Sequence, residues 1–166
     1  PTFALRRMLR IFPLYFTTLI VGFVVLPALH ALPSWLEQDH RHQALYWTYL
    51  VNWGTPFGHG GPGFGHFWSL AVEEQFYLLW PLAALFVAPR RLAAICLALV
   101  VTAFASRALL LAFLAPTEVA EKAVYYFTLT RWDALAAGGL VAIAMRDAEW
   151  RPIVLRQAAR ATAVAL

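Results

Sequence analysis

The length, composition and charge of this chain exclude an ordinary soluble domain and disfavour a nucleic-acid-binding protein. Of its 166 residues, 61% are hydrophobic and 13% are charged, against about 45–50% and about 25% in soluble domains. The net charge of +4 comes from arginines at the ends of apolar stretches, which is typical of membrane topology rather than of contacts with nucleic acid. We therefore expect an all-α, polytopic transmembrane helical bundle embedded in a lipid bilayer.

Four apolar stretches are long enough to cross the bilayer as helices, which takes about 20 residues each. They run over about residues 11–32, 67–88, 92–115 and 125–146, and a fifth stretch begins at about residue 152 and is cut off. Pro13 falls in the first turn of the first stretch, where its missing N–H costs little. Residues 1–166 are expected to form part of one membrane domain.

The segment over residues 33–66 separates the first two stretches and is mixed in character. Residues 44–53 are aromatic but too short to span, so we expect a helix that lies at the membrane surface or re-enters it. Residues 54–65 hold six of the nine glycines. No Gly-Lys-Ser/Thr follows them, which excludes a phosphate-binding Walker loop. The glycine-rich stretch is either a flexible connection or a mobile loop over a substrate cavity.

Basic residues test this topology, because arginine and lysine accumulate in cytoplasmic loops. Three arginine clusters lie before the first stretch, after the second and after the fourth: Arg6, Arg7 and Arg10; Arg90 and Arg91; Arg146, Arg151, Arg156 and Arg160. Two crossings separate each cluster from the next. All three clusters are therefore expected on one side, the cytoplasm.

The first arginine cluster has two interpretations. Arg6, Arg7 and Arg10 stand at a helix N-terminus, where the dipole and the free N–H groups also favour anions. Together these groups could bind the phosphates of a cytoplasmic coenzyme A thioester. Alternatively, the arginines only set the topology and contact lipid headgroups.

Two adjacent acids lie near the start of the second apolar stretch. Glu73 and Glu74 point about 100° apart on a helix, so one can face the bundle interior while the other reaches the interface. Glu73 shares a helix face with Ser69 and Tyr77. An inward carboxylate could orient a histidine, transfer a proton or bind a hydroxyl acceptor. The alternative is an acid pair that stabilises the helix start.

Three more charges lie within the apolar stretches, where a charge is costly unless it is paired or functional. Arg131 and Asp133 are two residues apart, so they point to nearly opposite sides of a helix and each needs another partner. We expect Arg131 to pair with Glu73 and Arg107 to pair with Asp133. These contacts belong either to a functional site or to structural ion pairs between helices.

Two other short patterns carry structural rather than catalytic expectations. Gly138 and Gly139 would let a neighbouring helix approach closely. His40 and His42 lack a further set of ligands at suitable spacing, so the sequence predicts no metal site.

Three pieces of the sequence resemble, in order, the motifs of the acyltransferase 3 family of bacterial membrane proteins. Residues 7–15 resemble its Arg-x-x-Arg stretch leading into Ile-x-Pro-x-Tyr. Residues 68–77 resemble its Trp-Ser-Leu-x-x-Glu-x-x-Phe-Tyr signature, closed by Trp80-Pro81. Residues 131–138 resemble its Arg-x-Asp-x-Leu-x-x-Gly element.

This resemblance implies a multi-pass enzyme of the bacterial inner (plasma) membrane. Such enzymes transfer an acyl group, often acetyl, from a cytoplasmic acyl-CoA to a hydroxyl of a carbohydrate acceptor. Acyl-CoA is then a donor substrate and no cofactor stays bound, while the acceptors include lipopolysaccharide and other cell-envelope or secreted glycans. The alternative is a transporter, or a non-catalytic export subunit for polysaccharide or lipid-linked sugar.

The resemblance also assigns roles to residues. The catalytic residues are predicted to be Glu73, Arg131 and Asp133, and donor or substrate binding falls to Arg7, Arg10, Ser69, Trp68 and Tyr77. The family's catalytic histidine lies on a helix that precedes the Arg-x-x-Arg stretch. We therefore expect the polypeptide of residues 1–166 to be inactive by itself, and its full-length parent to be the enzyme.

Overall fold

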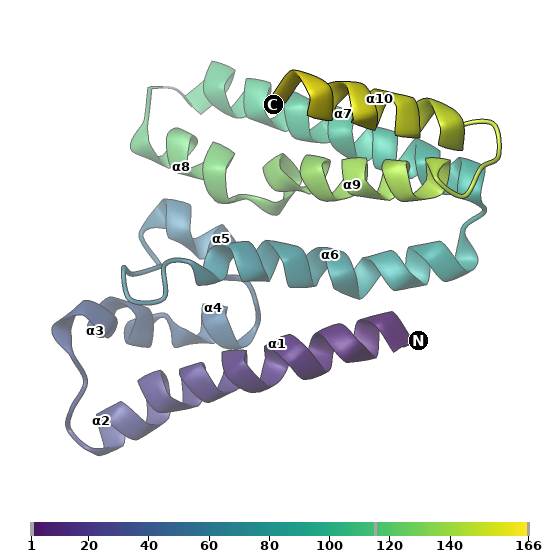
Figure 1. Cartoon of the computed structure of the whole chain (residues 1–166). Coiled ribbons are helices and arrows are strands. Elements are labelled where there is room, and N and C mark those ends of the chain that lie inside the picture. Colours follow the sequence, from purple (N-terminus) through teal and green to yellow (C-terminus); the bar gives the residue numbers. More distant parts are fainter. Residues whose placement is uncertain (1, 115, 166) are drawn as a thin grey trace.

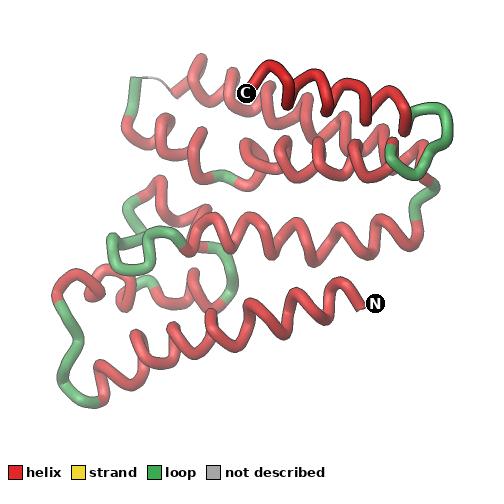
Figure 2. The backbone as a smooth tube through the Cα atoms, viewed as in Figure 1, coloured by secondary structure: helices red, strands yellow, loops and turns green. Residues whose placement is uncertain are grey.

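The computed structural model describes residues 2–114 and 116–165, and the side chains of residues 2–5, 7, 8 and 163–165 are outside that description. Every regular element in these two ranges is helical (Figure 2). The expectation of an all-α fold is confirmed.

Five long helices form the body of the molecule, and shorter ones connect them. The long helices are α1 (Thr2–Ile20), α6 (Phe67–Phe86), α7 (Pro89–Leu114), α9 (Thr128–Ala144) and α10 (Arg151–Ala165). A π-helical turn, η1 (Val21–Val25), and α2 (Leu26–Ala28) extend α1. The remaining short elements are α3 (Ser34–Arg41), α4 (Gln43–Trp47), α5 (Val51–Gly54), η2 (Thr55–Phe57) and α8 (Glu118–Tyr126).

The long helices lie roughly side by side, with α6 between α1 and the α7–α9–α10 group (Figure 1). The most extensive packing is between α7 and α9. Small buried residues mark these two helices, Cys96 and Ala103 on α7 and Ala136 and Gly139 on α9. Small side chains let helix backbones approach closely, which suits helices that are apolar on most of their surface.

The first helix differs from the expected stretch over residues 11–32. Because it begins at Thr2, Pro13 lies in its interior and not in its first turn. At the other end, His30 adopts a left-handed conformation with φ of 53°, and the Ala31 N–H donates to the Leu26 carbonyl at 2.9 Å. This is the bond pattern of a Schellman ending, and it stops the helix at Ala28, before the predicted end.

The later helices agree with the expected stretches, with one correction. Helix α6 coincides with residues 67–88 to within two residues, and α7 with residues 92–115 to within three. The fourth stretch is shorter than predicted, because the predicted polar link folds as α8 and continues to Tyr126. Thr117 caps α8 by accepting the Ala120 N–H at 3.1 Å. Phe127 is extended, with ψ of 140°, and α9 begins after it.

The first two arginine clusters and the start of the third lie towards one end of the molecule. The chain's N-terminus, the α6–α7 connection and the α9–α10 connection all lie at the same end in Figure 1, as the topology requires. We call this end the basic end. Among the described helices, two are long and apolar enough to cross a membrane: Leu9–Ala28, with a mean hydropathy of 2.0, and Pro89–Leu114, with 2.2.

An aromatic core joins α1 to the start of α6 through the segment over residues 33–66. Tyr15, Phe23, Tyr46, Phe64 and Phe67 are all buried within it. The segment over residues 44–53 forms two short helices, α4 and α5, in place of the single surface-lying or re-entrant helix expected. The segment is part of the core, because the Tyr46 side chain is 0% exposed.

Candidate functional site

Arg131 joins two of the motifs singled out in the sequence. Its guanidinium carbon lies 4.2 Å from the centre of the Tyr125 ring and 5.5 Å from that of the Trp68 ring. Its Nε donates to the Tyr125 carbonyl at 2.6 Å. A guanidinium is attracted to the electron-rich faces of aromatic rings. Trp68 at the start of α6 and Arg131 in the first turn of α9 therefore belong to one site.

Asp133 is paired with Arg107, as the charge balance predicted. Arg107 Nη2 donates to Asp133 Oδ2 at 2.8 Å and also to the Thr130 carbonyl. The two side chains are 26% and 20% exposed, so the pair is largely shielded between α7 and α9. This contact holds the first turns of α9, which carry Arg131, against α7.

The two adjacent acids of α6 differ in burial, as their separation of about 100° around the helix allows. Glu74 is only 9% exposed, whereas Glu73, the predicted catalytic acid, is half-buried. Ser69 is also half-buried, and its hydroxyl donates to the His66 carbonyl at 3.0 Å. The shared face of Glu73 and Tyr77 follows from the helical fold of α6. The pairing of Glu73 with Arg131 stays a prediction.

Tyr49 is the neighbour of Glu74 that the sequence did not indicate. It lies just after α4 with φ of 55°, which is rare for a bulky residue. Its ring stacks on that of Tyr15 at 4.3 Å, and its buried hydroxyl has no hydrogen-bond partner among the described residues. Burial raises the pKa of Tyr49 well above its ordinary value, and the nearby Glu74 carboxylate adds to this. The phenol therefore stays protonated beside the acid.

Polar side chains of α5, α6 and α9 form a hydrogen-bonded network that includes the Tyr49 carbonyl. Asn52 donates to Thr128 Oγ1 at 2.8 Å, and Gln75 donates to Asn52 Oδ1 at 3.0 Å. Thr128 donates in turn to Gln75, whose amide nitrogen also donates to the Tyr49 carbonyl at 2.6 Å. The sequence contained one indication of this network, because Gln75 is an amide inside an apolar helix. Its partners were not predictable because they lie 23 and 53 residues away.

The glycine-rich loop is anchored by Asp39. This fully buried carboxylate accepts the N–H groups of Gly61 at 2.8 Å and Gly63 at 2.9 Å, and also the Tyr46 hydroxyl. A Cβ at Gly61 or Gly63 would lie 2.5 or 2.8 Å from Asp39 Oδ2. These two glycines therefore serve close approach to a carboxylate. The sequence predicted a flexible connection or a mobile loop. Around Gly61 and Gly63, hydrogen bonds to Asp39 hold this loop in place instead.

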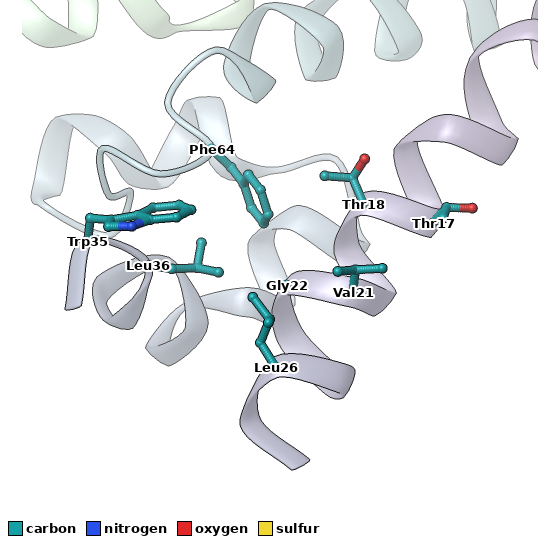
Figure 3. Close-up of a pocket in the computed structure, with 8 residues that line it drawn as sticks. All are labelled: Thr17, Thr18, Val21, Gly22, Leu26, Trp35, Leu36 and Phe64. Carbon is teal, nitrogen blue, oxygen red and sulfur yellow. The ribbon is translucent and has the colours of Figure 1, made fainter. Parts of the chain in front are cut away.

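Residues of α1 line two pockets. Arg10, Tyr15 and His66 border one of about 380 Å3 between α1 and the start of α6. The other, of about 290 Å3, lies beside the π-helical turn, where Phe64 and Leu36 point towards Gly22 (Figure 3). The side chain of Arg7, predicted to act with Arg10, lies outside the described residues.

Metal chemistry was not expected from the sequence. Among the described residues, no three His, Cys, Asp or Glu side chains cluster in a way that could hold a metal ion.

Comparison with known proteins gives a partial similarity. No protein-family model matches the chain, and no solved structure matches it. Over 88 residues the chain is 33% identical to the peptidoglycan O-acetyltransferase OatA of Listeria monocytogenes serovar 1/2a. The match covers 48% of this chain and 14% of that protein. About half of the chain thus corresponds to a small part of a relative whose name describes acetyl transfer.

Proposed function

We propose that this chain is part of a membrane-embedded O-acyltransferase of the acyltransferase 3 family. The full-length protein would transfer an acyl group, most simply acetyl, from coenzyme A to a hydroxyl of a cell-envelope carbohydrate. The observation that carries the proposal is the contact of Arg131 with Trp68, because it joins two motifs that the resemblance assigns to one site. The similarity to a peptidoglycan O-acetyltransferase supports the same reaction class.

The surface of the helices supports a multi-pass location in the inner membrane. Large apolar side chains point outward along them, with Leu14 73%, Phe86 84% and Phe113 79% exposed. Soluble monomers rarely expose large apolar patches. A bilayer would cover these side chains, and the basic end would face the cytoplasm.

The donor is proposed to bind near Arg10. Its pocket pairs this cation with an apolar wall formed by Ile11, Leu14 and Leu70. A guanidinium suits a phosphate, and an apolar wall suits the less polar arm that carries the thioester. Arg7 is proposed to share this role, one turn earlier on α1.

The acceptor is proposed to bind near the start of α6, with Trp68, Ser69 and Tyr77 as neighbours. Glu73 would hold the acceptor hydroxyl or orient the group that removes its proton. Arg131 would stabilise negative charge as the hydroxyl attacks the thioester carbonyl. Asp133 would act through Arg107, by fixing the position of α9.

The test is acyl transfer by the full-length protein in a deletion strain, read by mass spectrometry of envelope glycans. Glu73→Gln should lower ester content by at least about 100-fold, the lower range for a proton-transfer group. Glu37→Gln changes an exposed acid on α3 and should leave acylation intact. Near-normal product from Glu73→Gln would refute the site. Unaltered esters in the deletion strain together with lost glycan export would favour a transport role.

A further inference from the structure

A cavity of about 670 Å3 lies at the basic end of the molecule, between the start of α7 and the end of α9. Its volume falls within the range of about 300–1,000 Å3 that is usual for small-molecule sites. Apolar side chains form part of its wall: Ala93, Leu140, Ile143 and Ala144. No residue assigned above to donor, acceptor or catalysis lines it, so it is separate from the proposed acyl-transfer site.

Two guanidiniums border this cavity. Arg90 belongs to the first turn of α7, and Arg146 follows the last turn of α9. Among the side chains that the structure describes, neither has an ion-pair partner. A guanidinium binds phosphate oxygens through two parallel N–H groups. Both arginines are therefore available to a phosphate group that enters the cavity.

The connection between α9 and α10 brings opposite charge to the same cavity. Asp147 Oδ1 accepts the N–H groups of Glu149 at 2.9 Å and Trp150 at 3.3 Å, so its carboxylate is engaged in the turn. Glu149 and Trp150 also line the cavity, and the Trp150 side chain is 57% exposed. A carboxylate beside an indole ring suits an ammonium group.

We propose that this cavity binds the headgroup of a phosphoethanolamine lipid. The phosphate would lie at Arg90 and Arg146, and the ammonium at Glu149 and Trp150. Two cations and two acids line the cavity, so a zwitterion matches its charge better than a purely anionic headgroup, which would meet Asp147 and Glu149 without compensation. The apolar wall favours a lipid over a free phosphate. This inference rests on the proposed membrane location.

The test is native mass spectrometry of the detergent-purified full-length protein with phosphatidylethanolamine, phosphatidylglycerol and phosphatidylcholine at equal concentrations. Phosphatidylethanolamine should bind most tightly. Arg90→Gln with Arg146→Gln should weaken this binding at least about tenfold, because two charge-assisted phosphate contacts are lost. Arg156→Gln with Arg160→Gln removes the same charge from exposed positions on α10 and should leave the binding unchanged.

A second variant keeps the proposal falsifiable if the arginine variant unfolds. Glu149→Gln removes the ammonium partner and leaves the phosphate partners, so the lipid preference should move towards phosphatidylglycerol. Equal binding of all three lipids, an unchanged preference in Glu149→Gln, or equal loss in the α10 variant would overturn the proposal. Displacement of the lipid by inorganic phosphate, or by coenzyme A, would overturn it as well and assign the cavity to a soluble anion or to the donor.

Failure of the proposed function would look different. A full-length protein recovered in the soluble fraction would overturn both the membrane location and the lipid site. Because the lipid measurement uses neither donor nor acceptor, absent acyl transfer with intact lipid preference would refute the proposed function alone.

Discussion

Neighbouring glycines of α9 allow a direct test of how closely α9 approaches α6. A Cβ at Gly139 would lie 2.5 Å from Trp80 Cη2, whereas a Cβ at Gly138 would have no atom within 4 Å. The Trp80 ring has little freedom to move, because it stacks on Phe76 with ring centres 5.2 Å apart. Gly139→Ala should therefore be less stable than Gly138→Ala.

The magnitudes come from two opposing effects. Replacing glycine by alanine inside a helix gains about 1 kcal/mol at either position. Overpacking at Gly139 costs about 1–3 kcal/mol, so the two variants should differ by that amount, with Gly138→Ala the more stable. For a domain of this size, each kcal/mol shifts the unfolding midpoint by about 2–4 °C. The assay is thermal unfolding in detergent, and equal midpoints for the two variants would refute the predicted contact between α6 and α9.

Three further predictions concern the polar contacts. Burial, and then the Asp39 carboxylate, raise the pKa of Tyr46 above its ordinary value of 10.0; stability should therefore be constant below about pH 10 and fall above it. Tyr46→Phe should remove part of that alkaline loss in unfolding curves measured across this range. Arg107→Gln and Asp133→Asn should each cost less than the about 3–5 kcal/mol of a fully buried pair, since the side chains are 26% and 20% exposed. Their double-mutant cycle should show a coupling of about 0.5–3 kcal/mol, and a value of zero would contradict the pair. Thr128→Val should cost about 1–3 kcal/mol by leaving its buried amide partners unsatisfied, and unchanged unfolding would show that the network carries no stability.

Charge balance and hydropathy were sufficient to predict several contacts from the sequence. The pairing of Arg107 with Asp133 was predictable because a charge inside an apolar helix needs a counter-charge, and Asp133 was available. The close approach at Gly139 was predictable because small residues mark helix contacts in membranes, although its neighbour Gly138 faces open space. The common end of the N-terminus, the α6–α7 connection and the α9–α10 connection was predictable from the number of crossings between them.

Which of the two adjacent acids of α6 is the more buried was not predictable, and the reason is physical. Glu73 and Glu74 differ by about 100° around the helix, and only a clear apolar stripe would decide which one faces inward. Helix α6 is apolar on most sides, with Leu78, Leu79 and Leu82 all more than half exposed, so its sequence defines no such stripe. The position of Tyr49 near Glu74 was equally hidden, because it depends on how the segment over residues 33–66 folds back on α1 and α6.

The contacts of Arg107 change the interpretation of Asp133. Arg107 donates to both Asp133 and the Thr130 carbonyl, so one side chain binds the helix turn on both sides of Arg131. Arg131 itself contacts aromatic rings and a backbone carbonyl. We therefore interpret Asp133 as a positioning residue for Arg131. In the proposed acyl transfer, its loss should act through the geometry of α9 and not through lost chemistry at the proposed acceptor site.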